Sequence, residues 1–129
     1  MKSYRNFCIT LENLHYIYDY DEPYTIVILT GLVGLYRLCF EQSWKMMKEL
    51  LSQSGYAESA TGVPRSILKL AYSAGMIHDE IVWMQALQAR NNASHSYNEN
   101  IALTIVRQTK ESFYPMFVQL QEEVEAHLL

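Results

Sequence analysis

The sequence predicts an all-α protein, an antiparallel four-helix bundle with one additional short helix. Apolar residues recur at steps of three and four from one end of the chain to the other, which is the period of an amphipathic helix. Strand-like alternation, internal repeats and low-complexity tracts are not visible. At 129 residues, half of them apolar, the chain has the size and composition of one ordinary domain, so we expect a single helical domain over residues 1–129.

The first two helices are predicted on either side of a polar turn at residues 21–23. Ser3 is the expected cap of the first helix. Its apolar face is formed by Phe7, Leu11, Leu14 and Tyr18. Pro23 lacks an amide hydrogen and has a fixed φ, both harmless in a first helical turn, so a long second helix is expected over residues 23–54. Gly55 supplies its end.

Two shorter helices are expected after a polar loop at residues 56–63. Pro64 opens the first of them, and Gly75 fits a left-handed C-terminal stop. Its narrow apolar face is formed by Ile67, Leu68 and Ala71. The next helix is predicted over residues 79–93, because Asp79 and Glu80 place negative charge at its N-terminus.

The last helix is predicted to begin near Asn98 and to be kinked. Its periodic face consists of Ile105, Thr109, Phe113, Phe117, Leu120 and Val124. Pro115 removes one helical hydrogen bond and clashes with the preceding turn, so the kink is expected around residues 112–115.

Composition limits the classes of function. The net charge of −4 and the pI near 5.5 argue against broad adhesion to nucleic acid or anionic membranes, so any RNA contact is expected to be local. Cys8 and Cys39 lack metal or redox spacing, and both are expected to be reduced and buried. His78 is interpreted as part of a helix cap rather than as a metal ligand. No metal or cofactor is expected.

The protein is expected to be cytoplasmic. Its first residues show no apolar segment followed by a cleavage site, so no secretory signal is predicted. Residues 24–40 are nearly all apolar or small, but a membrane span needs about twenty such residues. This stretch continues with helical periodicity into polar sequence, so a buried central helix is favoured over a membrane span.

The candidate site follows the predicted fourth helix, where Arg90 and Asn91 precede His95 and Tyr97. Arg90 shares a helical face with Trp83, and on periodicity alone an arginine there packs its stem or pairs with a carboxylate. An ideal helix would separate Arg90 and His95 by roughly 140°, so the helix must end or distort between them if they act together. Asn91 and its polar neighbours favour such an ending.

Arginine and histidine together suit metal-free cleavage of RNA. His95 can move a proton to or from the ribose 2′-hydroxyl or the leaving oxygen, and Arg90 can bind the crowded phosphate of the transition state. General acid and general base are separate tasks, and a symmetric homodimer would bring two such histidines. Water or arginine could also fill the second role.

The sequence resembles the nucleotidyltransferase substrate-binding family, a branch of the HEPN superfamily. Trp44, Lys45 and Lys48 resemble a signature on the second helix, and residues 62–65 resemble the start of the third. A second part of the sequence resembles the family in the spacing of Ala71, Gly75, Ile77, Asp79 and Trp83. A third part resembles a polar block of the family and consists of Arg90, Asn91, His95 and Tyr97. Residues 35–37 depart from the family's Arg-Phe-Glu triplet and lack its carboxylate, while Glu41 stands where the family has a second glutamate.

The resemblance implies a partner, a minimal nucleotidyltransferase, and for many family pairs a toxin–antitoxin relation. The HEPN member is then an RNase toxin, and the partner transfers AMP to the tyrosine two places after the histidine, here Tyr97. Such a bulky anionic adduct beside His95 would repel RNA. The alternative is a non-catalytic subunit that presents substrate to the transferase. Trp44 and Trp83 could stack bases, but as residues of apolar faces they are interpreted mainly as core.

Overall fold

The computed structural model describes residues 1–56, 59 and 61–128. In this part of the chain all regular structure is helical, and the predicted all-α bundle is confirmed. The helices are α1 (Lys2–His15), α2 (Ile26–Gln53), α3 (Pro64–Ser73), α4 (Glu80–Asn92), α5 (Glu99–Gln108) and α6 (Tyr114–His127). Short helical turns follow α1 at Tyr16–Asp19 and α4 at Ala93–His95, and a π-helical turn, Thr109–Phe113, joins α5 to α6.

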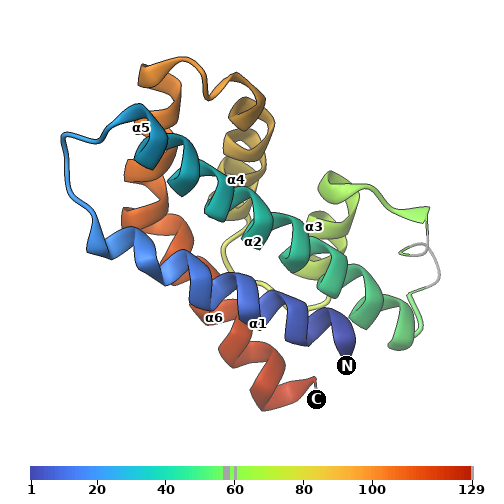
Figure 1. Cartoon of the computed structure of the whole chain (residues 1–129). Helices are drawn as coiled ribbons and strands as arrows, with labels where there is room; N and C mark the ends of the chain where they lie inside the picture. The colour runs from blue at the N-terminus through green and yellow to red at the C-terminus, as the bar shows by residue number, and fades with distance from the viewer. Residues whose placement is uncertain (57–58, 60, 129) are drawn as a thin grey trace.

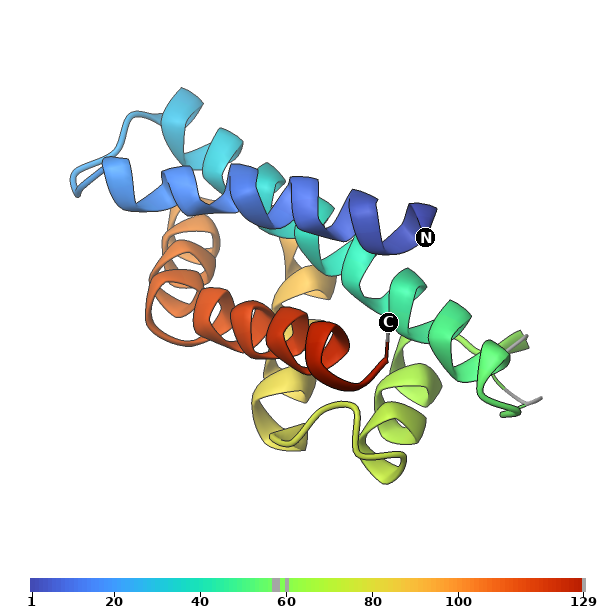
Figure 2. The same cartoon turned by 90° about the horizontal axis from the view of Figure 1, so that it is seen from below.

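The long helix α2 is the centre of the arrangement. Helix α1 lies alongside it and runs in the opposite direction, while α4 and the α5–α6 unit pack on its other sides (Figure 1). Figure 2 shows that the chain changes direction between α5 and α6. Because α2 contacts α1, α3, α4 and α5, it fixes the place of the α4–α5 connection, which carries the candidate site.

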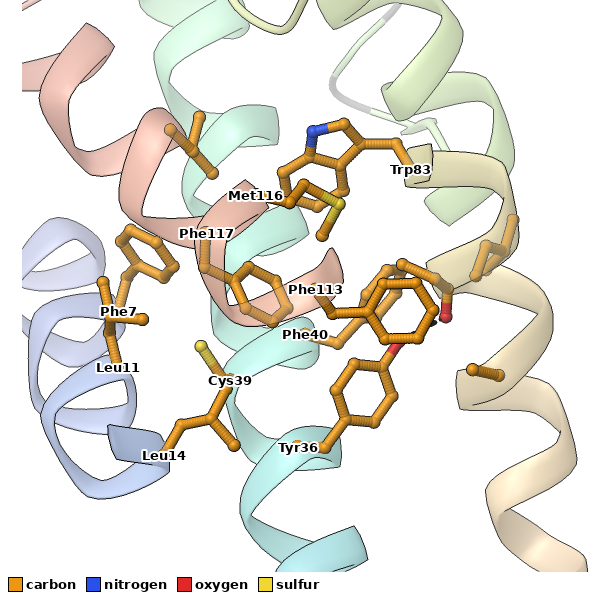
Figure 3. Packing of buried hydrophobic residues seen from close by; sticks show 14 of the residues in the cluster. Phe7, Leu11, Leu14, Tyr36, Cys39, Phe40, Trp83, Phe113, Met116 and Phe117 are labelled. Carbon is orange, nitrogen blue, oxygen red and sulfur yellow. Dashed lines mark hydrogen bonds between the residues drawn. The ribbon is translucent and has the colours of Figure 1, made fainter. Parts of the chain in front are cut away.

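One cluster of buried apolar side chains holds the helices together (Figure 3). Phe117 of α6 is at its centre, with its ring 6.3 Å from that of Phe7 in α1 and 5.6 Å from that of Trp83 in α4. Tyr36 is fully buried, and its hydroxyl donates to the Ala86 carbonyl oxygen of α4. Burial raises the pKa of this phenol well above its ordinary value, so the hydroxyl stays protonated.

Several helix ends differ from the predictions. Helix α1 begins at Lys2, and Ser3 lies inside its first turn with a buried Oγ that has no partner among the described residues. Tyr18 is 41% exposed, and Ile17 is buried instead, because the tighter 3₁₀ turn changes which residue faces inward. Helix α2 begins at Ile26 rather than at residue 23, because the Thr25 hydroxyl accepts the Ile28 amide at 3.2 Å and so caps it.

Other boundaries agree with the sequence. Gly55 and Gly75 follow α2 and α3 with φ of 94° and 79°, the left-handed conformation expected of them. The carboxylate of Asp79 caps α4 by accepting the Val82 amide at 3.1 Å. His78 does not contribute to that cap; its Nε2 lies 3.6 Å from Oε2 of Glu123 on α6.

The predicted kink near Pro115 is realised as the π-helical turn Thr109–Phe113, which lies slightly earlier than expected. Pro115 has no amide hydrogen to donate to the preceding turn, and the wider turn accommodates its ring. The Thr109 hydroxyl, fully buried, donates to the Ile105 carbonyl oxygen at 2.7 Å.

Helix α2 is long and apolar enough, by length and composition, to cross a membrane. Its most apolar 18-residue window has a mean hydropathy of 1.3, and 39% of that window is buried in the protein. The core helix of a soluble protein meets the same criteria, so this is weak evidence for a membrane span. Cys39, in the buried face of this helix, has its thiol pKa raised by burial, whereas Cys8 is only half-buried rather than buried as expected.

Candidate functional site

The predicted end of the helix between Arg90 and His95 is present. Helix α4 ends at Asn92, and a 3₁₀ turn over Ala93–His95 follows. The Ser94 hydroxyl donates to the Asn91 carbonyl oxygen at 3.2 Å, which is the competition with helical bonding expected of such residues. The side chains of Arg90 and His95 therefore do not follow one continuous α-helix.

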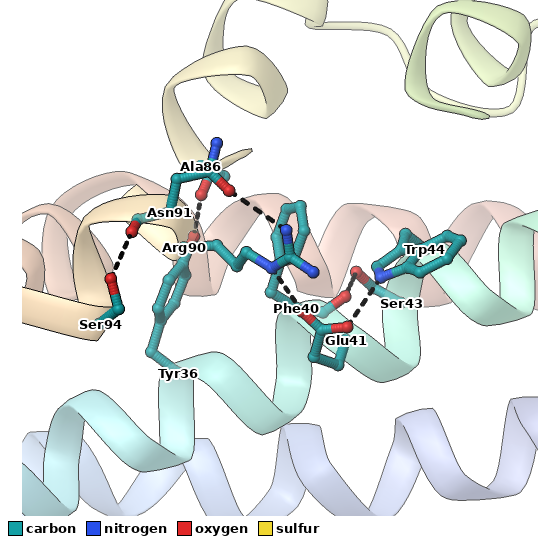
Figure 4. Close-up of polar contacts among 9 residues, drawn as sticks. All are labelled: Tyr36, Phe40, Glu41, Ser43, Trp44, Ala86, Arg90, Asn91 and Ser94. Carbon is teal, nitrogen blue, oxygen red and sulfur yellow. Dashed lines mark hydrogen bonds and ion pairs between the residues drawn. The ribbon is translucent and has the colours of Figure 1, made fainter. Parts of the chain in front are cut away.

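Arg90 points toward α2 (Figure 4). Its Nε donates to Oε1 of Glu41 at 2.6 Å, and its Nη1 donates to Oδ1 of Asn91 at 3.1 Å. The side chain is 31% exposed. Among the described residues its Nη2 has no hydrogen-bond partner, so part of the guanidinium fork is left to bind an anion.

Glu41 is held from two sides. Its second carboxylate oxygen, Oε2, accepts the indole N–H of Trp44 at 3.0 Å, while Oε1 takes the bond from Arg90 (Figure 4). Burial acts to raise the pKa of Glu41, but the hydrogen bonds from Arg90 and Trp44 and the positive charge of Arg90 outweigh it and lower the pKa below its ordinary value. Glu41 is therefore ionised at neutral pH and fixes the orientation of Arg90.

Trp44 and the lysines of the second-helix signature surround this ion pair on one side. Trp44 is half-buried, and Nζ of Lys48 lies 5.8 Å from the centre of its ring, within the range of a cation–π contact. Lys45 is exposed, and its charge contributes to the lowered pKa of Glu41. Trp44 thus packs against the edge of the core and also orients Glu41.

Trp83 is 2% exposed and packs between the rings of Phe40 and Phe117. The core interpretation is confirmed for this tryptophan, and it is not accessible to a base. The two tryptophans of the sequence therefore have different roles, one in the core and one beside the Glu41–Arg90 pair.

His95 and Tyr97 are brought together. Nδ1 of His95 lies 3.3 Å from the Tyr97 hydroxyl, and the two rings meet edge to face with their centres 5.9 Å apart. Both side chains are exposed, Tyr97 to 80%. The backbone of the turn holds them in place, because the amides of Ser96 and Asn98 donate to the carbonyl oxygens of Ala93 and His95 at 3.1 and 2.9 Å.

The structure thus forms two neighbouring groups from the predicted site residues. Arg90, Asn91, Trp44 and Lys48 gather around Glu41, and His95 pairs with Tyr97. No hydrogen bond joins Arg90 to His95 in the described part of the chain, so their joint action on one phosphate stays a prediction. The described residues also contain no group of three or more His, Cys, Asp or Glu arranged to hold a metal ion.

The protein family of the chain follows from comparison with known proteins. The sequence profile of the family described as "Nucleotidyltransferase substrate binding protein like" matches residues 1–126. The chain belongs to this family. The match extends from α1 through α6, so every element that positions Arg90, His95 and Tyr97 is part of the family region.

A relative from Haemophilus influenzae is named "Probable ribonuclease HepT". It is 29% identical to this chain over 83 residues, which are 63% of this chain and 57% of the relative. The match therefore spans little more than half the length of that relative.

A solved structure from Haemophilus influenzae has the same fold, with a TM-score of 0.70 over 96% of this chain and 95% of the other. It is described as showing the fold of a substrate-binding domain of a nucleotidyltransferase. The two sequences are 22% identical, so this likeness supports the fold alone.

Glu41 is the site residue that sequence reasoning left without a role. The signal that could have found it was its place in the family resemblance, one turn before Trp44. Residues 35–37 contain no carboxylate, and the ion pair with Arg90 is made by Glu41. Tyr36, the central residue of these three, anchors α4 through its bond to Ala86.

Proposed function

We propose that this protein is the HEPN-type subunit of a two-component minimal nucleotidyltransferase system and that it is a metal-independent endoribonuclease toxin, silenced when its partner transfers AMP to Tyr97. The observation that carries the proposal is the exposed His95–Tyr97 pair on a turn directly after the helix that holds Arg90. The family and the relative named as a probable ribonuclease support it. We place the system in the cytoplasm.

The proposed chemistry uses side chains from two copies of this chain. Nε2 of His95 can take the proton of a ribose 2′-hydroxyl. The 2′-oxygen then attacks the adjacent phosphorus, and the bond from this phosphorus to the 5′-oxygen of the next nucleotide breaks. The free face of the Arg90 guanidinium would bind the phosphate as its charge develops. Protonation of the leaving oxygen is a second task, which a second chain of a homodimer would supply.

The alternative is a non-catalytic subunit that presents substrate to the nucleotidyltransferase. The Arg90–Glu41 ion pair favours it, because an arginine already neutralised by a carboxylate has less charge to offer a phosphate. The family description, nucleotidyltransferase substrate binding, points the same way. This reading requires a pocket at the transferase interface but no proton transfer by His95.

Substitution of the two candidate catalytic residues separates the readings. Arg90→Ala and His95→Ala should each abolish growth inhibition and reduce cleavage of cellular RNA by about a hundredfold or more, with the helical circular dichroism spectrum retained. Addition of EDTA should leave cleavage by the unaltered protein unchanged. Retained cleavage in either folded variant, or a strict need for magnesium, would reject the ribonuclease mechanism.

A further inference from the structure

His95 and Tyr97 form a pair whose geometry is suited to a reaction other than RNA cleavage. The Tyr97 hydroxyl lies 3.3 Å from Nδ1 of His95, on the imidazole edge opposite Nε2. A phenol is a weak nucleophile until its proton is removed, and a neutral imidazole within hydrogen-bond reach is the usual base for that task. We propose that His95 is the general base that deprotonates Tyr97 during its own nucleotidylation, so that one histidine serves both RNA cleavage and the silencing of that activity.

The inference rests on the proposed function for the identity of the acceptor, and it adds a catalytic role within this chain. The partner transferase would bind the nucleoside triphosphate. The Tyr97 oxygen attacks the α-phosphorus while its proton moves to Nδ1 of His95. An oxygen–phosphorus bond forms, the bond from the α-phosphorus to the bridging oxygen breaks, and pyrophosphate leaves with that oxygen. His95 then returns its proton to water, and Tyr97 holds AMP as a phosphodiester.

Each ring nitrogen of His95 would act as the base in one of the two reactions. To accept the proton of Tyr97, Nδ1 must be unprotonated, which places the imidazole hydrogen on Nε2. To accept a ribose proton, Nε2 must be unprotonated, and the hydrogen then lies on Nδ1, where it can be donated to the Tyr97 oxygen. His95 is exposed to solvent, so exchange with water can interconvert the two tautomers.

The surroundings of His95 leave it free to act as a base. Its turn packs against α4 and α5, and the charged residues nearest along those helices are Arg90 and Glu99. Arg90 is directed to Glu41, and Glu99 lies exposed in the first turn of α5. His95 makes no ion pair in the described part of the chain, so the Tyr97 hydroxyl is the titratable group that faces it directly.

The experiment compares His95→Asn with the unaltered protein as acceptors for the cognate transferase. Asparagine can keep a hydrogen bond at the position of Nδ1 but cannot take up a proton at neutral pH. With magnesium and ATP, initial rates of AMP incorporation are followed by intact mass, and the site is identified by peptide mapping. We expect His95→Asn to be modified roughly a hundredfold more slowly, with the KM for the acceptor chain little changed. His95→Ala should be as slow.

A pH series provides a readout that a structural role would not change. The ratio of the unaltered rate to the His95→Asn rate removes the pH dependence of the transferase itself. The ratio should be high at alkaline pH and fall toward one on acidification, because a protonated imidazole can no longer accept a proton. His127→Asn is the matched control: this histidine is 67% exposed at the end of α6, far from the α4–α5 connection (Figure 1), and its substitution should leave the rate unchanged.

The outcomes separate the two proposals. If AMP is found on Tyr97 and the His95→Asn and His95→Ala variants are modified at the unaltered rate, the role of His95 as base is wrong while the silencing mechanism stands. If the unaltered protein takes up no AMP on Tyr97, both are wrong. Tyr97→Phe should take up no AMP at this site, so whatever RNA cleavage it retains should be unchanged by incubation with the transferase and ATP.

Discussion

At the scale of single residues, the Glu41 carboxylate decides what Arg90 can do. It accepts the Arg90 Nε at 2.6 Å and the Trp44 indole at 3.0 Å, and it leaves Nη2 of the guanidinium without a protein partner in the described residues. An arginine held at Nε presents its outer edge in one orientation, which reduces the entropy lost when it binds a phosphate. We therefore expect Glu41→Ala to lower the rate of RNA cleavage about tenfold to a hundredfold, because Arg90 is misplaced. Glu41→Gln should lower the rate less. Cleavage assays on the purified variants give both rates.

The pH dependence of stability tests the same contact. Hydrogen bonds from Arg90 and Trp44 lower the pKa of Glu41, so its carboxylate stabilises the fold above the unfolded value of about 4.3, and that contribution is lost as the pH falls through the lower folded value. Urea titrations should show that the unaltered protein loses more stability than Glu41→Gln between pH 5 and pH 3. Parallel losses in the two proteins would mean that the ion pair contributes nothing to folding.

At the scale of secondary structure, the N-terminal cap of α4 positions the whole segment that leads to the site. Asp79 accepts the Val82 amide at 3.1 Å, and α4 then runs without interruption to Asn92. Asp79→Ala should lower the free energy of unfolding by about 1 kcal/mol, because one amide of the first turn loses its partner. Asp79→Asn keeps a side-chain oxygen at the cap and should cost only a few tenths of a kcal/mol.

Urea denaturation followed by circular dichroism gives both values, and the difference between the two substitutions is the quantity of interest. Equal stability of Asp79→Ala and Asp79→Asn would show that the cap bond does not stabilise α4.

The π-helical turn at Thr109–Phe113 is the main irregularity between α5 and α6. Its buried Thr109 hydroxyl donates to one backbone carbonyl oxygen in this region.

At the scale of the whole molecule, the fold presents the α4–α5 connection at one end of the bundle, where a second chain or a transferase can reach it (Figure 1). One chain supplies one suitable histidine, while cleavage of RNA uses an acid and a base. We therefore expect a homodimer, with sedimentation at micromolar concentration giving twice the 15.0 kDa of one chain. Observation of monomer alone under these conditions would exclude the two-histidine mechanism.

The sequence by itself determined which residues form helices and where most of them end. Apolar periodicity located the core residues of α3 and α6, and Gly75 and Asp79 marked boundaries through local backbone chemistry. The helix end after Arg90 was also predictable, since the polar side chains that compete with helical hydrogen bonds lie next to one another in the chain. These features depend on neighbours in sequence.

The tertiary structure decided the contacts between residues that are distant in sequence. Glu41 and Arg90 are 49 positions apart, and they meet only because α2 and α4 pack together through the core. Packing also separated the two tryptophans, with Trp83 enclosed by aromatic rings and Trp44 left at the edge to bind Glu41. The pairing of His95 with Tyr97 depends on two overlapping turns, closed by the bonds from Ser96 to Ala93 and from Asn98 to His95. Helical periodicity, which repeats over three to four residues, could not predict it.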